Sequence, residues 1–140
     1  PSAGTISANI DRNPRDRKKM AVRESGRAAV SHYKLIQRLP GTSHVEVSLE
    51  SGRTHQIRVH LTHIGYPIVG DPLYGRGPIK QKGLHASAIE AINGFSRQAL
   101  HARTLKLVHP ETEEECEFHA PLADDIVELI DKLKQSIADD

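Results

Sequence analysis

Residues 51–60, Ser-Gly-Arg-Thr-His-Gln-Ile-Arg-Val-His, place a tight turn, a helix start and several cationic or titratable side chains together. Backbone N–H groups are unpaired at a helix N-terminus, and the helix dipole favours a negative charge there. Arg53 lies beside this end and Arg58 lies one turn inside the helix. The run therefore predicts a site for a phosphate, or for a carboxylate kept ionised. A surface helix with solvated arginines is the alternative interpretation.

The residues before this run predict an antiparallel hairpin. A β-rich stretch covers 27–39 and ends at the turn pair Pro40-Gly41. In the next stretch three apolar residues alternate with polar ones, the period-2 pattern of a half-buried strand. These residues are Val45, Val47 and Leu49.

The residues after the turn predict a helix over about 54–64. Its apolar stripe follows the spacing i, i+4, i+7 and consists of Ile57, Leu61 and Ile64. Thr54 is expected to be the N-cap, and Gly65 is expected to end the helix.

The second half of the chain predicts a loop, two strands and a helix. Residues 67–83 are rich in Gly and Pro, and strands are expected near 99–109 and 113–119, divided by Pro110. The C-terminal helix is marked by apolar residues at helical spacing, namely Leu122, Ile126, Ile130, Leu133 and Ile137. This order predicts an α+β fold with a mixed, mainly antiparallel sheet and flanking helices.

Charge is distributed unevenly, although the net charge is only +1. Residues 12–27 are basic and the last thirty residues are acid-rich, which suits a polyanion partner approached from one side. A solvated charged loop is the alternative. Residues 1–26 show no clean period and are interpreted as an extended basic segment, with 27–140 as the globular part. The single cysteine, Cys116, fits a reducing cytoplasm, and no apolar stretch approaches the roughly 18 residues of a membrane span.

Metal and nucleophile chemistry find little support. His60 and His63 are three residues apart, but no nearby Asp, Glu or Cys completes a ligand set, so no metal site is expected. No serine lies in a Gly-x-Ser-x-Gly context, and no Walker-type or dinucleotide glycine pattern occurs.

Several segments together resemble the RluA-type pseudouridine synthases, closest to their large-subunit ribosomal branch. The segments are 51–60, Gly-Tyr-Pro-Ile-Val-Gly-Asp-Pro-Leu-Tyr-Gly at 65–75, Arg-Lys-Lys-Met-Ala-Val at 17–22, Ala-Val-Ser-His-Tyr at 29–33, Arg-Gln-Ala-Leu-His-Ala at 97–102 and His-Pro at 109–110. The resemblance spans nearly the whole chain. It implies an enzyme that isomerises uridine to pseudouridine in RNA without a metal or organic cofactor. It also implies that the partner is RNA, in particular large-subunit ribosomal RNA, and that the protein is cytoplasmic.

The resemblance also implies roles for individual residues. Arg58 matches the family arginine that forms an ion pair with a catalytic Asp, and Leu100 matches an apolar position near the flipped base. An ordinary strand residue in the core is the alternative for Leu100. Candidates for RNA contact are Arg53, His55, Gln56, Arg15, Lys18 and Lys19.

The departure from the family pattern concerns the catalytic Asp. The family's His-Arg-Leu-Asp segment, and the strand whose Tyr stacks on the base, are expected to precede residue 1. Asp71, in the Gly-Asp-Pro loop, is not expected to replace that Asp. The chain is therefore interpreted as the C-terminal portion of one catalytic domain, inactive alone. A non-catalytic RNA-binding module and a piece left by proteolysis are the alternatives.

Overall fold

The computed structural model describes residues 2–75, 84–100, 104–108, 115–119 and 122–138. In chain order the elements are β1 (Ala3–Ser7), β2 (Ile10–Arg12), β3 (Met20–Val22), β4 (Val30–Leu39), β5 (Thr42–Leu49), α1 (Gln56–His63), α2 (Ala86–Asn93), β6 (Thr104–Val108), β7 (Glu115–His119) and α3 (Asp124–Ala138). Strands and helices are mixed along the chain, and every strand pairing in the described ranges is antiparallel, which confirms the α+β class. Within the same ranges, no helix is long and apolar enough to cross a membrane.

The main sheet has three strands in the order β1-β4-β5. The predicted hairpin is its β4–β5 pair, in which Tyr33 faces Val47 and the turn at Pro40-Gly41 lies between the strands. Gly41 has a φ of 66°, a left-handed conformation that glycine adopts without steric cost. A register shift between Leu35 and Gln37 marks a bulge in β4.

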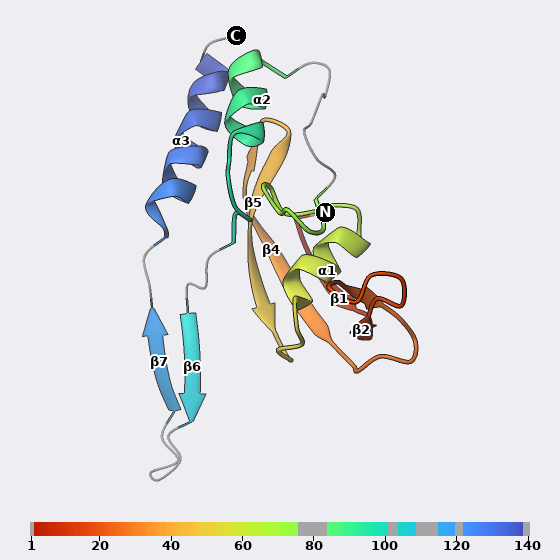
Figure 1. Cartoon of the computed structure of the whole chain (residues 1–140). Coiled ribbons are helices and arrows are strands. Elements are labelled where there is room, and N and C mark those ends of the chain that lie inside the picture. The colour runs from red at the N-terminus through yellow and green to blue at the C-terminus, as the bar shows by residue number, and fades with distance from the viewer. Residues whose placement is uncertain (1, 76–83, 101–103, 109–114, 120–121, 139–140) are drawn as a thin grey trace.

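The N-terminal residues are more structured than their sequence indicates. The interpretation of 1–26 as a basic segment outside the globular part is wrong, because β1 is a full member of the main sheet. Strands β2 and β3 form a separate two-stranded ribbon beside α1 (Figure 1). Ile6 and Ile10 are buried, so this segment supplies part of the core. Strands β1, β2 and β3 are short, and a charged loop separates β2 from β3. A period-2 pattern is therefore hard to recognise in this segment.

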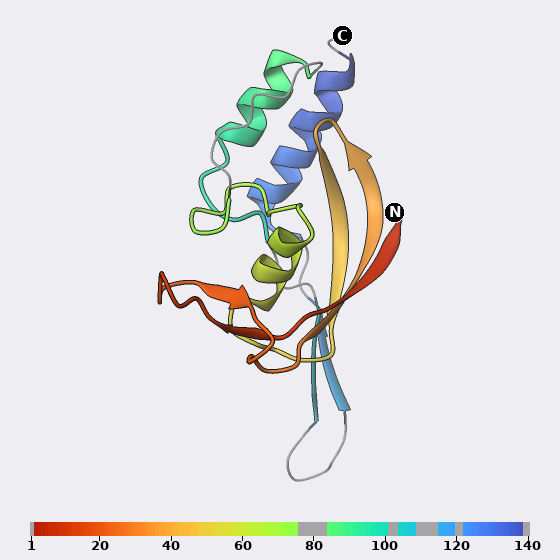
Figure 2. The same cartoon turned by 90° about the vertical axis from the view of Figure 1, so that its right-hand side faces the viewer.

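The described residues form two separate clusters of buried apolar side chains. One lies under α1 and joins Ile10, Ala29 and Val59. The other lies between α2 and α3, which pack side by side at one end of the sheet (Figures 1 and 2). Its buried members are Ala88, Ile92, Leu129 and Leu133. The C-terminal helix is confirmed, but α2 was not predicted.

The predicted second strand pair is present as β6 and β7, which face each other as an antiparallel hairpin. The expected turn at Pro110 lies outside the described residues. This hairpin forms a sheet of its own and projects away from β1, β4 and β5 (Figure 1).

Candidate active site

The loop that enters α1 has an unusual backbone. His55 takes the N-cap position with φ 55° and ψ 24°, the left-handed region that non-glycine residues rarely adopt. Its side chain makes no capping hydrogen bond, and Thr54 is not the N-cap, contrary to the sequence prediction. Strain of this kind persists where surrounding contacts hold it, and it gathers at functional sites.

Gln56 supplies the contacts that hold this loop. Its Oε1 accepts hydrogen bonds from the Ser51 hydroxyl at 2.8 Å and from the Arg53 backbone N–H at 3.0 Å. Its Nε2 donates to the Val30 carbonyl and to Ser31 Oγ, both at 3.0 Å. Gln56 is only 2% exposed and its amide is occupied on both sides, so these hydrogen bonds shape the loop.

The buried face of α1 is partly polar. Ser31 Oγ lies 2.7 Å from His60 Nδ1, and His60 Nε2 lies 2.9 Å from the Ala8 carbonyl. A carbonyl only accepts, so Nε2 carries the proton and Nδ1 accepts from Ser31. The helix thus buries Gln56, Val59 and His60, whereas the predicted stripe of Ile57, Leu61 and Ile64 is only half-buried. His60 has a structural role.

Arg58 is held by a carboxylate of this chain. Its Nε donates to Asp71 Oδ2 at 2.9 Å and its Nη2 donates to Asp71 Oδ1 at 2.8 Å. The Asp71 side chain is fully buried and that of Arg58 is 12% exposed. The same Oδ1 accepts from the backbone N–H groups of Leu73 and Tyr74. Asp71 is therefore fully engaged, in keeping with the expectation that it does not replace the catalytic Asp.

The Arg58 pair fixes the charge of both groups. Burial alone raises the pKa of Asp71, but the hydrogen bonds from Arg58, Leu73 and Tyr74 outweigh burial and hold that pKa below its ordinary range. The hydrogen bond to Asp71 raises the pKa of Arg58, against the opposing effect of burial. Both groups stay ionised at neutral pH.

One edge of the Arg58 guanidinium is not bound by any residue in the described part of the chain. The pair with Asp71 uses Nε and Nη2, and the Tyr74 ring lies 5.0 Å from Cζ, a cation–π distance. Nη1 has no hydrogen bond to any residue that the structure describes. A planar guanidinium fixed on one edge can accept a second carboxylate on the other without rearranging.

Tyr74 couples His55 to strand β3. The Met20 backbone N–H donates to Tyr74 Oη at 2.8 Å, and Tyr74 Oη lies 2.8 Å from His55 Nδ1. Because Met20 occupies the acceptor side of the phenol, the hydroxyl proton is left for His55 Nδ1. Burial and the nearby Arg58 lower the pKa of His55, only partly opposed by Asp71, so the ring is neutral at pH 7 with its proton on Nε2.

A groove beside the start of α1 brings the predicted pocket residues together. It has a volume of about 350 Å³, and the predicted site residues that line it are Arg53, His55, Gln56, Arg58 and Leu100. Leu49 completes an apolar wall with Leu100, and its 44% exposure shows that this part of β5 is open. An apolar wall with a few convergent polar groups is typical of a small-ligand site.

The remaining predicted phosphate contacts lie elsewhere. Arg15, Lys18 and Lys19 belong to the loop between β2 and β3, where Arg15 and Lys18 are exposed, and they line neither this groove nor the second hollow described below. They remain candidates for RNA contact.

Sequence reasoning missed the partners of Arg58. Asp71 and Tyr74 lie in Gly-Asp-Pro-Leu-Tyr, a loop that contributes to the family resemblance but for which the sequence predicts no contact with Arg58. Gly70 has a φ of 76°, and a side chain there would collide with the Arg97 carbonyl, so the loop must pack closely at this point. An Asp followed by a Pro and a Tyr is a usable signal of an ordered turn.

Changing Tyr74 to Phe tests the Tyr74–His55 coupling. The variant leaves the half-buried Met20 N–H without its acceptor, so we expect a loss of about 1–3 kcal/mol in the free energy of unfolding. It also removes the donor that stabilises neutral His55, so the pKa of His55 should rise toward its ordinary value of about 6.5. Urea denaturation and NMR titration of the imidazole measure the two effects.

The matched control is Tyr66→Phe, since Tyr66 is 69% exposed and should tolerate the change. The pH dependence has a definite sign. A folded-state pKa below the unfolded one means that the contribution of His55 to stability is complete above about pH 6.5 and decreases as the pH falls below it. Equal titration of His55 in Tyr74→Phe and wild type would contradict the coupling.

A family model, curated relatives and solved structures that are similar to this chain all belong to the pseudouridine synthases. A family model described as RNA pseudouridylate synthase matches residues 1–63. The ribosomal large subunit pseudouridine synthase D of Xanthomonas campestris is 49% identical over 98% of this chain, and the match covers 41% of that protein. The protein of the same name from Pseudomonas aeruginosa is 46% identical over 96% of this chain and 42% of its own length.

Solved structures agree. The human RNA Pseudouridylate Synthase Domain Containing 1 superposes with a TM-score of 0.66 at 27% identity, covering 86% of this chain and 49% of that one. The α+β fold is thus that of solved pseudouridylate synthase domains. The chain belongs to the RluA-type RNA pseudouridylate synthases. It spans about two fifths of the length of the curated relatives that it matches.

Proposed function

We propose that this chain is the C-terminal portion of a pseudouridine synthase catalytic domain whose substrate is a uridine of large-subunit ribosomal RNA. The reaction breaks the bond between C1′ of the ribose and N1 of uracil, and rejoins the base through C5. Its relatives carry the name of a ribosomal large subunit enzyme, which supports the substrate class. A ribosomal RNA substrate supports the cytoplasm as the proposed location of the protein.

The observation that carries the proposal is the half-engaged guanidinium of Arg58. Asp71 takes one edge, and the groove lined by Arg58, His55 and Leu100 lies beside it. A catalytic Asp contributed from outside these 140 residues can bind the other edge, where a positive charge within about 4–6 Å lowers its pKa by roughly 1–3 units. An ionised carboxylate serves both attack on C1′ and removal of a ribose proton.

The groove suits a nucleoside that has left the RNA stack. Leu49 and Leu100 offer an apolar wall to the base, and the neutral His55 ring offers an N–H donor from Nε2. Extrusion of a base costs a few kcal/mol, which contacts to the flanking phosphates can offset.

The test is direct. The 140-residue chain, incubated with ribosomal RNA carrying tritium at uracil C5, should release no tritium above background, because it lacks the Asp. The same chain with the preceding segment of its gene restored should release tritium. Turnover by the 140-residue chain itself would contradict the assignment, and so would a preceding segment that contains no His-Arg-Leu-Asp motif.

A non-catalytic RNA-binding module is the second candidate. The basic loop between β2 and β3 favours it, because exposed arginines and lysines bind RNA without chemistry. This module binds RNA equally with or without the preceding segment and never releases tritium.

A further inference from the structure

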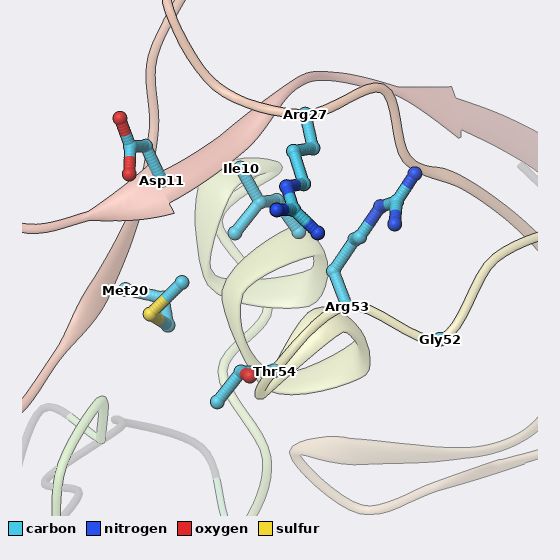
Figure 3. A pocket seen from close by; sticks show the side chains of 7 residues that line it. All are labelled: Ile10, Asp11, Met20, Arg27, Gly52, Arg53 and Thr54. Carbon is cyan, nitrogen blue, oxygen red and sulfur yellow. The ribbon is translucent and has the colours of Figure 1, made fainter.

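A second hollow lies on the other side of the loop that enters α1. It has a volume of about 250 Å³ and is lined by Ile10, Asp11, Met20, Arg27, Gly52, Arg53 and Thr54. Figure 3 shows two arginine side chains entering it from different walls, Arg27 from the segment before β4 and Arg53 from the loop before α1. Arg27 ends the basic stretch 12–27 that the sequence predicts to suit a polyanion partner, but it is not among the predicted site residues.

The two arginines are held in different ways: Arg27 through its backbone alone, and Arg53 through its backbone and its side chain. The Arg27 backbone exchanges two hydrogen bonds of 2.9 Å with Ile10, a residue that is only 3% exposed. Arg53 is fixed by its side-chain Nε, which donates to the Ala28 carbonyl at 3.0 Å, while its backbone N–H is held by Gln56. Because its Nε is already held, the Arg53 side chain loses less conformational freedom when it binds a ligand.

Neither guanidinium has an acidic partner among the described residues. Arg58 and Arg97 each form a two-point ion pair with an aspartate, and Arg27 and Arg53 form none. Two like charges that share a hollow repel each other until an anion lies between them. The outer nitrogens of Arg53, Nη1 and Nη2, donate no hydrogen bond to any described residue and can therefore bind that anion.

The one acid at the hollow does not fill this role. Figure 3 shows the Asp11 carboxylate pointing away from both guanidinium groups. Its Oδ1 accepts a hydrogen bond from the Arg12 backbone N–H at 2.7 Å. The space between Arg27 and Arg53 is therefore open to an external anion.

The position of the hollow identifies the anion. Gly52 and Arg53 line both this hollow and the groove that contains Arg58 and Leu100. The space around Gly52 is open, since nothing lies within 4 Å of where a side chain would start. A nucleotide whose base enters the groove must carry its own backbone phosphates past this shared wall.

We propose that Arg27 and Arg53 together bind one backbone phosphate adjacent to the target uridine. The inference rests on the proposed function, because it uses the groove as the nucleoside pocket. Planar guanidinium groups match the geometry of phosphate oxygens, and two of them on one phosphate fix the register of the RNA.

The test measures how tightly the 140-residue chain binds a uridine-containing RNA hairpin, by fluorescence anisotropy from 50 to 200 mM KCl. Arg27→Gln and Arg53→Gln should each weaken binding roughly tenfold. The double variant should lose less than the product of the single losses, because both side chains act on the same phosphate. Its salt slope should fall by about one phosphate contact rather than two.

The matched control is Arg38→Gln, which removes the same charge from an exposed position on β4 that lines neither cavity. A series of hairpins, each with one phosphate near the uridine replaced by a neutral methylphosphonate, locates the contact. At one position the replacement should weaken binding by the wild type but not by Arg27→Gln. If the two arginine variants behave like Arg38→Gln, or no position shows this pattern, the phosphate site is wrong.

This result is independent of catalysis. If the arginine variants lose RNA affinity non-additively but the extended chain releases no tritium, the phosphate site is supported and the synthase function is contradicted. If the extended chain releases tritium but Arg27→Gln and Arg53→Gln bind RNA as tightly as wild type, the synthase function is supported and the phosphate site is contradicted. Circular dichroism of each variant shows whether the loop has kept its fold, and Arg27→Gln makes the test independent of the Arg53–Ala28 hydrogen bond.

Discussion

Asp71→Ala should lower the free energy of unfolding by about 3–5 kcal/mol, the cost of leaving a buried charge without its partner. The Asp71 side chain is fully buried and that of Arg58 is 12% exposed, so water replaces little of what the carboxylate provides. The variant also removes the acceptor for two backbone N–H groups in the loop that follows. Urea denaturation followed by circular dichroism measures the loss.

The control for Asp71→Ala is Asp125→Ala. Asp125 forms an ion pair of the same two-point geometry with Arg97, but their side chains are 48% and 40% exposed. Exposed pairs are screened by solvent and contribute little. A midpoint shift for Asp125→Ala as large as that for Asp71→Ala would show that burial does not decide the strength of the Arg58 pair.

The pH dependence of stability gives a second check on Asp71. Its folded-state pKa lies below the unfolded value of about 3.9, so the contribution of Asp71 to stability is complete above that value. That contribution is lost as the pH falls through the folded-state pKa. Asp71→Ala should therefore lose less stability than wild type between pH 5 and pH 2. Parallel acid denaturation of the two proteins would contradict a lowered pKa.

The strands of the β4–β5 hairpin and the helices α1 and α3 could be predicted because each carries its own local signal. Alternating valines, a Pro-Gly turn and a stripe of aliphatic residues all act over a few positions. Strands β1–β3 escaped because they are short and owe their form to distant partners. Helix α2 is as long as α1, and its buried face packs against the distant helix α3. Ile10, for example, is buried by α1 and by a bridge to Arg27, neither of which a local pattern contains.

The same limit applies to the site. The motif at 51–60 supplies Arg58 and the candidates for RNA contact Arg53, His55 and Gln56, and the resemblance at 97–102 supplies Leu100. All five line one groove, while their roles stay predictions. The pairing of Arg58 with Asp71 depends on how a loop folds back onto α1, which residue spacing does not encode. The polar face of α1 was hidden for a related reason. Burying Gln56 and His60 is favourable only because Ser31 and Ala8 satisfy their hydrogen bonds.

Arg58→Lys, made in the chain extended by the preceding segment of its gene, should lower kcat by roughly 10²–10³-fold. A lysine keeps the charge, but its single ammonium cannot bind Asp71 at two points and a second carboxylate at the same time. RNA affinity should change little, because the net charge of the groove is preserved. Single-turnover tritium release and anisotropy with the same RNA separate the two quantities.

A purely structural role for Arg58 would also reduce activity, so the pH profile decides between the interpretations. If the free Nη1 edge holds the catalytic Asp ionised, weakening that contact should move the acidic limb of kcat/KM to higher pH by up to about 1–3 units. Asp71→Ala, assayed at a temperature where it remains folded, keeps the guanidinium and should shift the limb less. Equal limbs in Arg58→Lys, Asp71→Ala and wild type would mean that Arg58 supports the loop alone and that another residue neutralises the catalytic carboxylate.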